Sequence, residues 1–195
     1  MGMAIRRARW SDRAVVNRLL HDAFVDDPVS VWVFPDATDR SIRHSALISA
    51  FLDLTLSEGR VDMTRDGTAV ALWLSVPAGQ LADGSGPALV REVVDPDNER
   101  IELMGRLTEA AHPTDRAHEY LQLVAVEPGR QGEGLGGALI SATLTHCDRQ
   151  GVPAYLEAST ARSRCLYERL GFAFTGRTVD LPGGPAMWPM WRDPR

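Results

Sequence analysis

The sequence is poor in features that several classes of protein require. Its two cysteines, Cys147 and Cys165, are too few for a disulfide framework and lack the spacing of a zinc site. The uncharged stretch 71–82 contains Pro77 and is too short to cross a bilayer. No apolar run follows the arginines near the N-terminus, so we expect no secretory signal. These absences predict a soluble, cytoplasmic protein with no membrane partner.

Positive charge is also scarce. The chain has 21 Lys and Arg against 26 Asp and Glu, a formal net charge of −5. Proteins that bind nucleic acid or anionic lipid need clustered basic residues, so we expect neither partner. The acidic balance is compatible with electrostatic attraction of a cationic substrate.

Length and composition predict one globular domain spanning 1–195. A chain of 195 residues falls within the usual size of a single domain. Its 44% hydrophobic and 24% charged residues are typical of a folded protein with a core of ordinary size.

Hydrophobic periodicity predicts a mixed α/β sheet in one layer, with helices on both faces. Ser11 is the expected N-cap of the first helix. The turn 65–67 (R-D-G) predicts a hairpin between the first two strands. The expected helices cover about 12–24, 39–57, 87–94, 99–111, the segment ending near 150, and 162–170; the expected strands cover 60–64, 68–76, 119–126, 153–158, 172–180 and 186–191.

The segment 26–36 is predicted to be a loop, because it holds two prolines. It also carries two large aromatic residues, Trp32 and Phe34, and apolar bulk in a loop needs a surface to pack on. Two interpretations stay open: the loop closes over the core, or these aromatic residues line a substrate pocket.

The most informative stretch is the glycine-rich segment 126–140, which follows a strand and leads into a helix. Unpaired backbone N–H groups and the helix dipole at such a place favour a phosphate or diphosphate group. Glycine allows that group to approach the backbone closely. A tight strand-to-helix turn without a ligand is the alternative.

Two nucleotide motifs compete for this segment. Gly132, Gly134 and Gly137 satisfy G-x-G-x-x-G, and Glu157 lies twenty residues after Gly137. In a dinucleotide-binding unit, however, the first glycine directly follows the strand, whereas five residues intervene here, and too little chain remains for the further strand–helix units. A Walker A loop is excluded because no G-K-[ST] follows.

The segment 126–136 reads V-x-P-x-x-Q-G-x-G-L-G, and 151–172 contains G-V-P-A-Y-L-E-A-S-T followed by C-L-Y-E-R-L-G-F. Together, in this order, they resemble the acetyl-coenzyme A (acetyl-CoA) motif and the tyrosine-containing second motif of the Gcn5-related N-acetyltransferase (GNAT) superfamily. The resemblance implies a single GNAT domain with splayed central strands. It also implies an acceptor-side half, 1–118, and an acetyl-CoA half, 119–195. Ser163 stands where the family usually has Asn.

This resemblance implies direct transfer of an acetyl group from acetyl-CoA to an amine. The glycine loop would hold the diphosphate, the strand before it would pair with the pantetheine amides, and one of its N–H groups would stabilise the oxyanion. The implied cofactor-binding residues are Val124, Ala125, Val126, Gln131, Gly132, Glu133, Gly134, Leu135, Gly136, Gly137, Ser163 and Tyr167.

The resemblance makes Tyr167 the general acid that protonates the leaving thiolate, because a phenol of pKa near 10 suits a thiol of pKa about 8.5. A tyrosine packed in the core is the structural alternative. The general base is left open among Glu157, Glu119, Asp27 and His118, with Glu157 preferred. The expected acceptor-pocket residues are Asp27, Trp32, Phe34, Tyr120 and Gln122.

Several functional alternatives stay open. The acceptor is expected to be a small-molecule primary amine, for example in an antibiotic or an aminonucleoside; a protein N-terminus or lysine is the second choice. An acyl-CoA-binding module without turnover is the third. We expect no metal, because Gln122 stands where H-E-x-x-H needs its second histidine. The apolar stretch 187–191 fits either a homodimer contact or a packed terminal strand.

Overall fold

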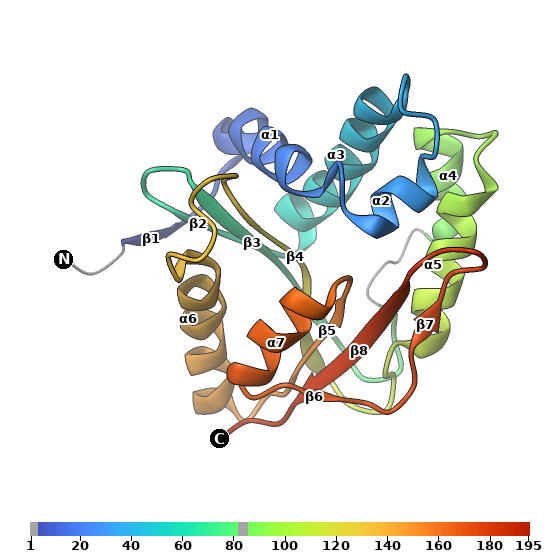
Figure 1. Cartoon of the computed structure of the whole chain (residues 1–195). Helices are drawn as coiled ribbons and strands as arrows, with labels where there is room; N and C mark the ends of the chain where they lie inside the picture. The colour runs from blue at the N-terminus through green and yellow to red at the C-terminus, as the bar shows by residue number, and fades with distance from the viewer. Residues whose placement is uncertain (1–3, 82–85) are drawn as a thin grey trace.

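One mixed sheet runs through the computed structural model, which describes residues 4–81 and 86–195 (Figure 1). Its strands follow the order β1-β2-β3-β4-β5-β8-β6, and β7 pairs with β8. Only β4 and β5 run parallel among these pairs. The strands are β1 (Ile5–Arg7), β2 (Arg60–Thr64), β3 (Ala69–Val76), β4 (His118–Val126), β5 (Ala154–Ala158), β6 (Ala173–Phe174), β7 (Val179–Asp180) and β8 (Ala186–Arg192).

Helices cover both faces of the sheet, which confirms the predicted α/β architecture (Figure 1). α1 (Arg13–Phe24) and α3 (Arg40–Glu58) pack on one face, and α6 (Leu135–Gln150) and α7 (Ala161–Arg169) on the other. A third apolar cluster joins α2 (Pro28–Val33) and α5 (Glu99–Ala111) to β7 and β8. α4 (Pro87–Val94) packs on α5. In the described ranges no helix is long and apolar enough to span a membrane.

The two central strands part soon after they meet. β4 and β5 are in register only at Glu119 opposite Ala154 and at Tyr120 opposite Tyr155. β4 then continues to Val126 beside β3, whereas β5 continues to Ala158 beside β8. This is the splayed pair of central strands that the sequence resemblance implied.

A β-bulge in β4 sets which backbone groups face the gap between the two strands. Leu72 pairs with Leu123 and Trp73 with Leu121, so Gln122 is the extra residue. Below the bulge, the Glu119 N–H bonds to the Pro153 carbonyl on the β5 side. Above it, the Glu127 N–H bonds to Thr68 on the β3 side. Because alternate residues face opposite edges of a strand, the N–H groups of Val124 and Val126 face β5.

The structure corrects the predicted loop at 26–36. Residues Pro28–Val33 form α2, because Pro28 occupies the first helical position and the Asp27 side chain accepts a hydrogen bond from the Val29 N–H. Pro28 therefore begins a short helix and Pro35 follows it, so neither proline prevents the helix.

Three smaller expectations are also corrected. β1 was not predicted, since a strand of three residues carries little pattern. Ser11 lies inside a 3-10 helix (Trp10–Asp12) and does not cap α1. The single strand expected at 172–180 is two short strands, β6 and β7, which pair with opposite ends of β8. The apolar stretch 187–191 lies in β8, between β5 on one edge and β6 and β7 on the other.

The exit from α3 into β2 provides a test of the fold. A Cβ on Gly59 would overlap the Trp73 carbonyl oxygen and the Leu74 side chain. We expect Gly59→Ala to lower the free energy of unfolding by about 1–3 kcal/mol, as overpacking does, measured by urea denaturation. Glu58→Ala, at the exposed preceding residue, should change it by less than about 0.5 kcal/mol. Equal effects of the two substitutions would contradict this packing argument.

Candidate active site

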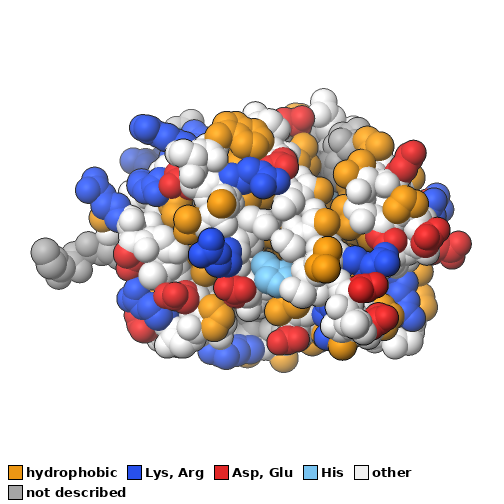
Figure 2. Space-filling model, turned by 90° about the horizontal axis from the view of Figure 1, so that it is seen from above, with side chains coloured by type: hydrophobic (Ala, Val, Ile, Leu, Met, Phe, Trp, Pro, Cys, Tyr) orange, Lys and Arg blue, Asp and Glu red, His pale blue; other side chains and the backbone are white. Residues whose placement is uncertain are grey.

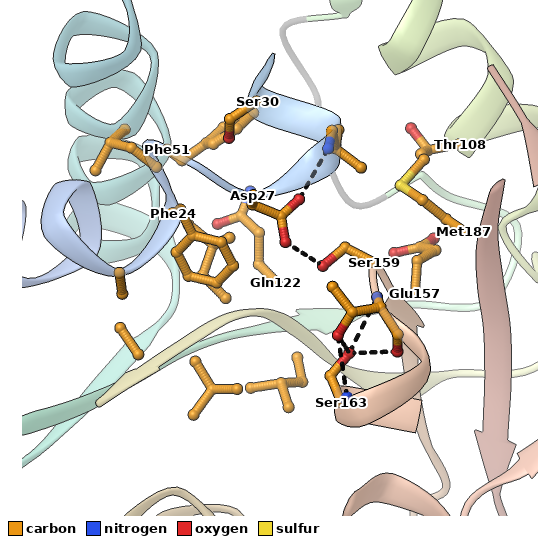
Figure 3. Close-up of a pocket in the computed structure, with 18 of the residues that line it drawn as sticks. Phe24, Asp27, Ser30, Phe51, Thr108, Gln122, Glu157, Ser159, Ser163 and Met187 are labelled. Carbon is orange, nitrogen blue, oxygen red and sulfur yellow. Dashed lines mark hydrogen bonds between the residues drawn. The ribbon is translucent and has the colours of Figure 1, made fainter. Parts of the chain in front are cut away.

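A cavity of about 650 Å³ opens where β4 and β5 part. Residues from both halves of the chain line it (Figure 3). β4 and the glycine loop form one side, the end of β5 and the start of α7 form another, and α1, α2, α3 and α5 close the remainder. The residues predicted from the sequence that line it are Asp27, Tyr120, Gln122, Val124, Ala125, Val126, Gln131, Gly132, Gly134, Leu135, Gly136, Gly137, Glu157, Ser163 and Tyr167.

The glycine loop has the geometry of an anion cradle. Gly132 and Gly134 have φ of 94° and 83°, and a Cβ on either would meet nothing within 4 Å. Gly134 caps α6, so the N–H groups of Leu135, Gly136 and Gly137 have no preceding carbonyl in the helix. Unpaired N–H groups, open space and the positive end of a helix of 16 residues together suit a diphosphate.

Arg130 holds this loop to the β2–β3 hairpin. Its Nη1 donates to Asp66 Oδ2 at 3.0 Å and its Nη2 to Glu133 Oε2 at 2.8 Å. These hydrogen bonds raise the pKa of the guanidinium, so Arg130 stays charged. Glu133 does not line the cavity; its carboxylate holds Arg130 instead.

Tyr167 on α7 lines the cavity and is 7% exposed. Among the described residues none forms a hydrogen bond with its hydroxyl group. Burial, and secondarily the charge of Asp27, raises the pKa of this phenol, so it is protonated at neutral pH. Thr160 and Ser163 cap α7 reciprocally: the Ser163 N–H donates to Thr160 Oγ1 at 3.1 Å and the Thr160 N–H to Ser163 Oγ at 3.2 Å.

Glu157 is a buried acid in the cavity wall. Its side chain is 6% exposed, and burial raises the pKa of its carboxyl group to about 7. Tyr120 donates a hydrogen bond to Oε2 at 2.9 Å. Oε1 is buried and has no hydrogen-bond partner among the described residues, and His112 Nδ1 lies 3.9 Å from it. A buried carboxylate that titrates near neutral pH is suited to accept a proton.

Asp27 joins the acceptor-side half to the end of β5. Its Oδ1 caps α2, and its Oδ2 accepts a hydrogen bond from Ser159 Oγ at 2.7 Å (Figure 3). Gln122, the bulged residue, accepts a hydrogen bond from Thr55 Oγ1 at 2.9 Å. Both side chains line the cavity, as expected, but each is held by a neighbouring element.

Trp32 and Phe34 lie outside the cavity wall. They are 7% and 2% exposed and belong to the cluster that joins α2 to β7 and β8. The Trp32 Nε1–H donates to the Pro182 carbonyl at 3.0 Å. Val29, Ser30 and Val33 present the cavity-facing side of α2 instead. Of the two interpretations of segment 26–36, closure over the core is therefore the one that holds for Trp32 and Phe34, and they do not line the pocket.

Two of the four candidate bases also lie away from the cavity wall. Glu119 Oε1 accepts a hydrogen bond from Ser75 Oγ at 2.6 Å. His118 is buried beside Trp191, and its Nδ1 lies 2.9 Å from the Arg116 carbonyl oxygen. Glu157 and Asp27 are the candidates that line it. Across 4–81 and 86–195, no group of three or more metal-ligating side chains is placed to hold a metal ion.

Sequence reasoning missed His112, which lines the cavity with a side chain that is 5% exposed. It follows the last residue of α5, and its ring packs against Tyr120 and Tyr155 at centroid distances of 4.9 and 4.7 Å. No motif in the sequence marks this residue, since its place depends on the packing of α5 against β4 and β5.

Comparisons with known proteins agree with this geometry. Residues 91–173 match the sequence profile of the acetyltransferase (GNAT) domain. A solved structure described as histone acetyltransferase HPA2 and related acetyltransferase, from Corynebacterium glutamicum, is 25% identical. Its TM-score is 0.76, and the alignment covers 100% of this chain and 98% of that one. The chain contains a GNAT acetyltransferase domain.

Two curated proteins are similar in sequence to this GNAT domain. An uncharacterized N-acetyltransferase of Schizosaccharomyces pombe is 26% identical over 88% of this chain and 75% of that protein. A mycothiol acetyltransferase of Brachybacterium faecium is 41% identical over 35% of this chain, but the match spans only 21% of that longer protein. The GNAT domain is thus an enzyme domain with N-acetyltransferase activity, and members of this superfamily use acetyl-CoA.

The buried carboxyl group predicts a pH-dependent stability. The pKa of Glu157 is about 7 in the fold against its ordinary value of 4.5. The folded state therefore holds this proton more tightly, and the stabilisation present below pH 4.5 is lost as the pH rises to 7. Relative to Glu157→Gln, the wild-type protein should lose about 3 kcal/mol of unfolding free energy over that range.

Urea denaturation at several pH values between 4.5 and 8 would measure this loss. Tyr120→Phe removes the hydrogen bond that favours the carboxylate, so it should shift the loss to higher pH. Parallel stability curves for the wild-type protein and Glu157→Gln would refute the raised pKa.

Proposed function

We propose that this GNAT domain transfers the acetyl group of acetyl-CoA directly to a primary amine of a small molecule. The observation that carries the proposal is that the glycine loop, Tyr167 and Glu157 face one cavity. An anion cradle, a protonated phenol and a carboxyl group that titrates near pH 7 are the parts that such a transfer needs.

The cofactor-binding residues are proposed to be those of β4, the glycine loop and α7. The N–H groups from Gln131 to Gly137 would hold the diphosphate, and the edge of β4 at Val124–Val126 would pair with the pantetheine amides. Arg162 and Arg169 on α7 also line the cavity and would add positive charge for the anionic cofactor. Bound acetyl-CoA supplies the acetyl group as an activated thioester.

Tyr167 is proposed as the general acid at the departing sulfur. Its hydroxyl is free of competing hydrogen bonds with described residues, and burial keeps it protonated. Removal from water disfavours the thiolate form of a thiol as well, so a thiolate that leaves into this cavity would be basic enough to take a proton from the phenol.

Glu157 is proposed as the general base. Its pKa near 7 means that a substantial fraction is ionised at neutral pH, and Oε1 is free to receive a proton. The Val124 N–H, which faces the gap between β4 and β5, is positioned to donate to a carbonyl oxygen there. Asp27 and Ser163 would then shape the site by holding α2 and α7 in place.

The acceptor pocket favours a small molecule with an apolar body. Phe24, Phe51, Met104 and Met187 line the part of the cavity enclosed by α1, α3, α5 and β8. The face seen from above carries interspersed charges of both signs around its edge and uncharged atoms at its centre (Figure 2), so it offers no extended basic surface. Both cysteines are free, which supports a reducing, cytoplasmic compartment.

An antibiotic or aminonucleoside is proposed as the acceptor class. The segments 23–28 (A-F-x-D-x-P) and 165–172 are similar to those of puromycin N-acetyltransferase, so puromycin is the first acceptor to test. A panel should also contain 2-phenylethylamine, agmatine, spermidine and a lysine-containing peptide. Release of CoA thiol from acetyl-CoA is the assay.

The first prediction for this mechanism concerns Tyr167. Tyr167→Phe should lower kcat about a hundredfold or more, as loss of a general acid does, while calorimetric CoA affinity stays within about twofold. If the wild-type protein acetylates only the lysine-containing peptide of the panel, the acceptor is a protein and not a small molecule. CoA binding without release for any amine would favour the non-catalytic module. Full activity of Tyr167→Phe would overturn the assignment of the acid.

The second prediction concerns Arg130. Arg130→Ala should raise the KM for acetyl-CoA about tenfold, because it frees the loop and leaves Asp66 and Glu133 uncompensated near the diphosphate. High salt should reduce the effect by screening. Arg13→Ala breaks a comparable ion pair with Asp53, between α1 and α3, and should leave this KM unchanged. Equal KM values for the two variants would refute the role of Arg130.

A further inference from the structure

A chain of hydrogen bonds reaches the cavity from a backbone carbonyl behind it. His118 Nδ1 lies 2.9 Å from the Arg116 carbonyl oxygen. His118 Nε2 lies 2.9 Å from His112 Nε2. His112 Nδ1 then faces Glu157 Oε1 at 3.9 Å, a distance too long for a direct hydrogen bond.

The carbonyl oxygen fixes the position of every proton in this chain. It only accepts, so His118 carries its proton on Nδ1. Both imidazoles are neutral, because burial lowers the pKa of His112 to about 4 and also lowers that of His118. His118 Nε2 is therefore an acceptor, His112 Nε2–H donates to it, and His112 Nδ1 presents a lone pair to the cavity.

Glu157 presents a second acceptor beside this lone pair. Tyr120 donates to Oε2, which leaves Oε1 without a partner among the described residues. Two acceptors 3.9 Å apart cannot bond to each other, but one nitrogen can lie within hydrogen-bond distance of both. An amino group with two N–H bonds satisfies both.

We propose that His112 Nδ1 and Glu157 Oε1 together bind the acceptor's amino group, and that this pair selects primary over secondary amines. The inference rests on the proposed function and deepens it. A secondary amine in its neutral form has one N–H and leaves one of the two buried acceptors unpaired, which is costly. His118 is a positioning residue, because it fixes the tautomer of His112.

The proton balance of the transfer follows from this pair. The amine loses its ammonium proton to solvent as it enters, and the neutral amine donates one N–H to His112 Nδ1 and one to the ionised Glu157 Oε1. Its lone pair is then free to form the N–C bond. As the C–S bond breaks, the nitrogen gives one proton to Glu157 Oε1 and the sulfur receives one from Tyr167. Exchange with solvent restores Glu157 and Tyr167, and no oxidant or reductant is needed.

The test compares the fastest primary amine of the acceptor panel with its N-methyl derivative. His112→Phe keeps a ring between Tyr120 and Tyr155 but removes both nitrogens. We expect kcat/KM for the primary amine to fall about tenfold or more, as loss of a buried hydrogen bond does. The value for the N-methyl amine should change little, so the ratio of the two falls.

Other variants separate binding from folding. His112→Gln keeps a donor toward His118 but places no acceptor at the Nδ1 position, so the ratio should fall in the same way. His118→Phe removes the group that fixes the tautomer, whereas His118→Gln keeps an acceptor and should restore part of the ratio. CoA affinity, measured by calorimetry, should stay within about twofold of the wild-type value in each folded variant.

A second histidine pair, of which His44 is buried, provides the matched control. His44 Nδ1 lies 2.9 Å from His21 Nδ1, and burial lowers the pKa of His44 to about 4 as well. His44 also lines the cavity, from α3, but among the described residues its ring nitrogen contacts His21 and not Glu157. His44→Phe should therefore leave the ratio of the two amines unchanged, whatever it does to stability.

The outcomes distinguish this inference from the proposed function. Failure of the wild-type protein to acetylate any amine would overturn both. An active wild-type protein whose ratio is unchanged in His112→Phe and His112→Gln would overturn this inference alone. An equal fall of the ratio in His44→Phe would also overturn it, because the effect would then come from loss of any buried histidine.

Discussion

The parting of β4 and β5 is the constraint on which the rest of the site depends. Parallel strands that stayed paired would use the N–H groups of Val124 and Val126 within the sheet. Because their register ends at Tyr120 and Tyr155, these groups face a cavity instead, and the ends of both strands stand apart. The glycine loop continues from one strand and Glu157 lies near the end of the other, so both line the same cavity.

Burial of Glu157 at this gap both lowers the stability of the fold at higher pH and changes the acidity of the carboxyl group. Water around Glu157 is replaced by the rings of Tyr120, Tyr155 and His112, which raises the pKa of the carboxyl group. Hydrogen bonding, chiefly from Tyr120, opposes that rise in pKa without cancelling it. The result is an acid that changes protonation state near neutral pH, at the expense of the unfolding free energy above it.

The strand–loop–helix shape of the glycine segment could be predicted because its parts are contiguous in the chain. The glycine loop, the start of α6 and the Thr160–Ser163 cap each lie within a few residues, so local rules determine their shape. The acceptor side could not be predicted in the same way. The positions of Trp32 and Phe34 depend on contacts with Pro182 and the cluster at β7, about 150 residues away in the chain, and α2 was hidden by its prolines.

His112 shows most clearly why the missing information is tertiary. Nothing near it in the sequence marks a functional residue, and its chemistry is set by His118 six residues later and by Glu157 on another strand. The Arg116 carbonyl fixes the tautomer of His118, and His118 in turn fixes the tautomer of His112. The Nδ1 atom of His112, at the end of this series of hydrogen bonds, faces the cavity. A histidine at the same position, packed against a different strand, would have no defined proton to give or to accept. The selectivity that we infer therefore belongs to the packing of α5 on β4 and β5, and the sequence motifs alone do not contain it.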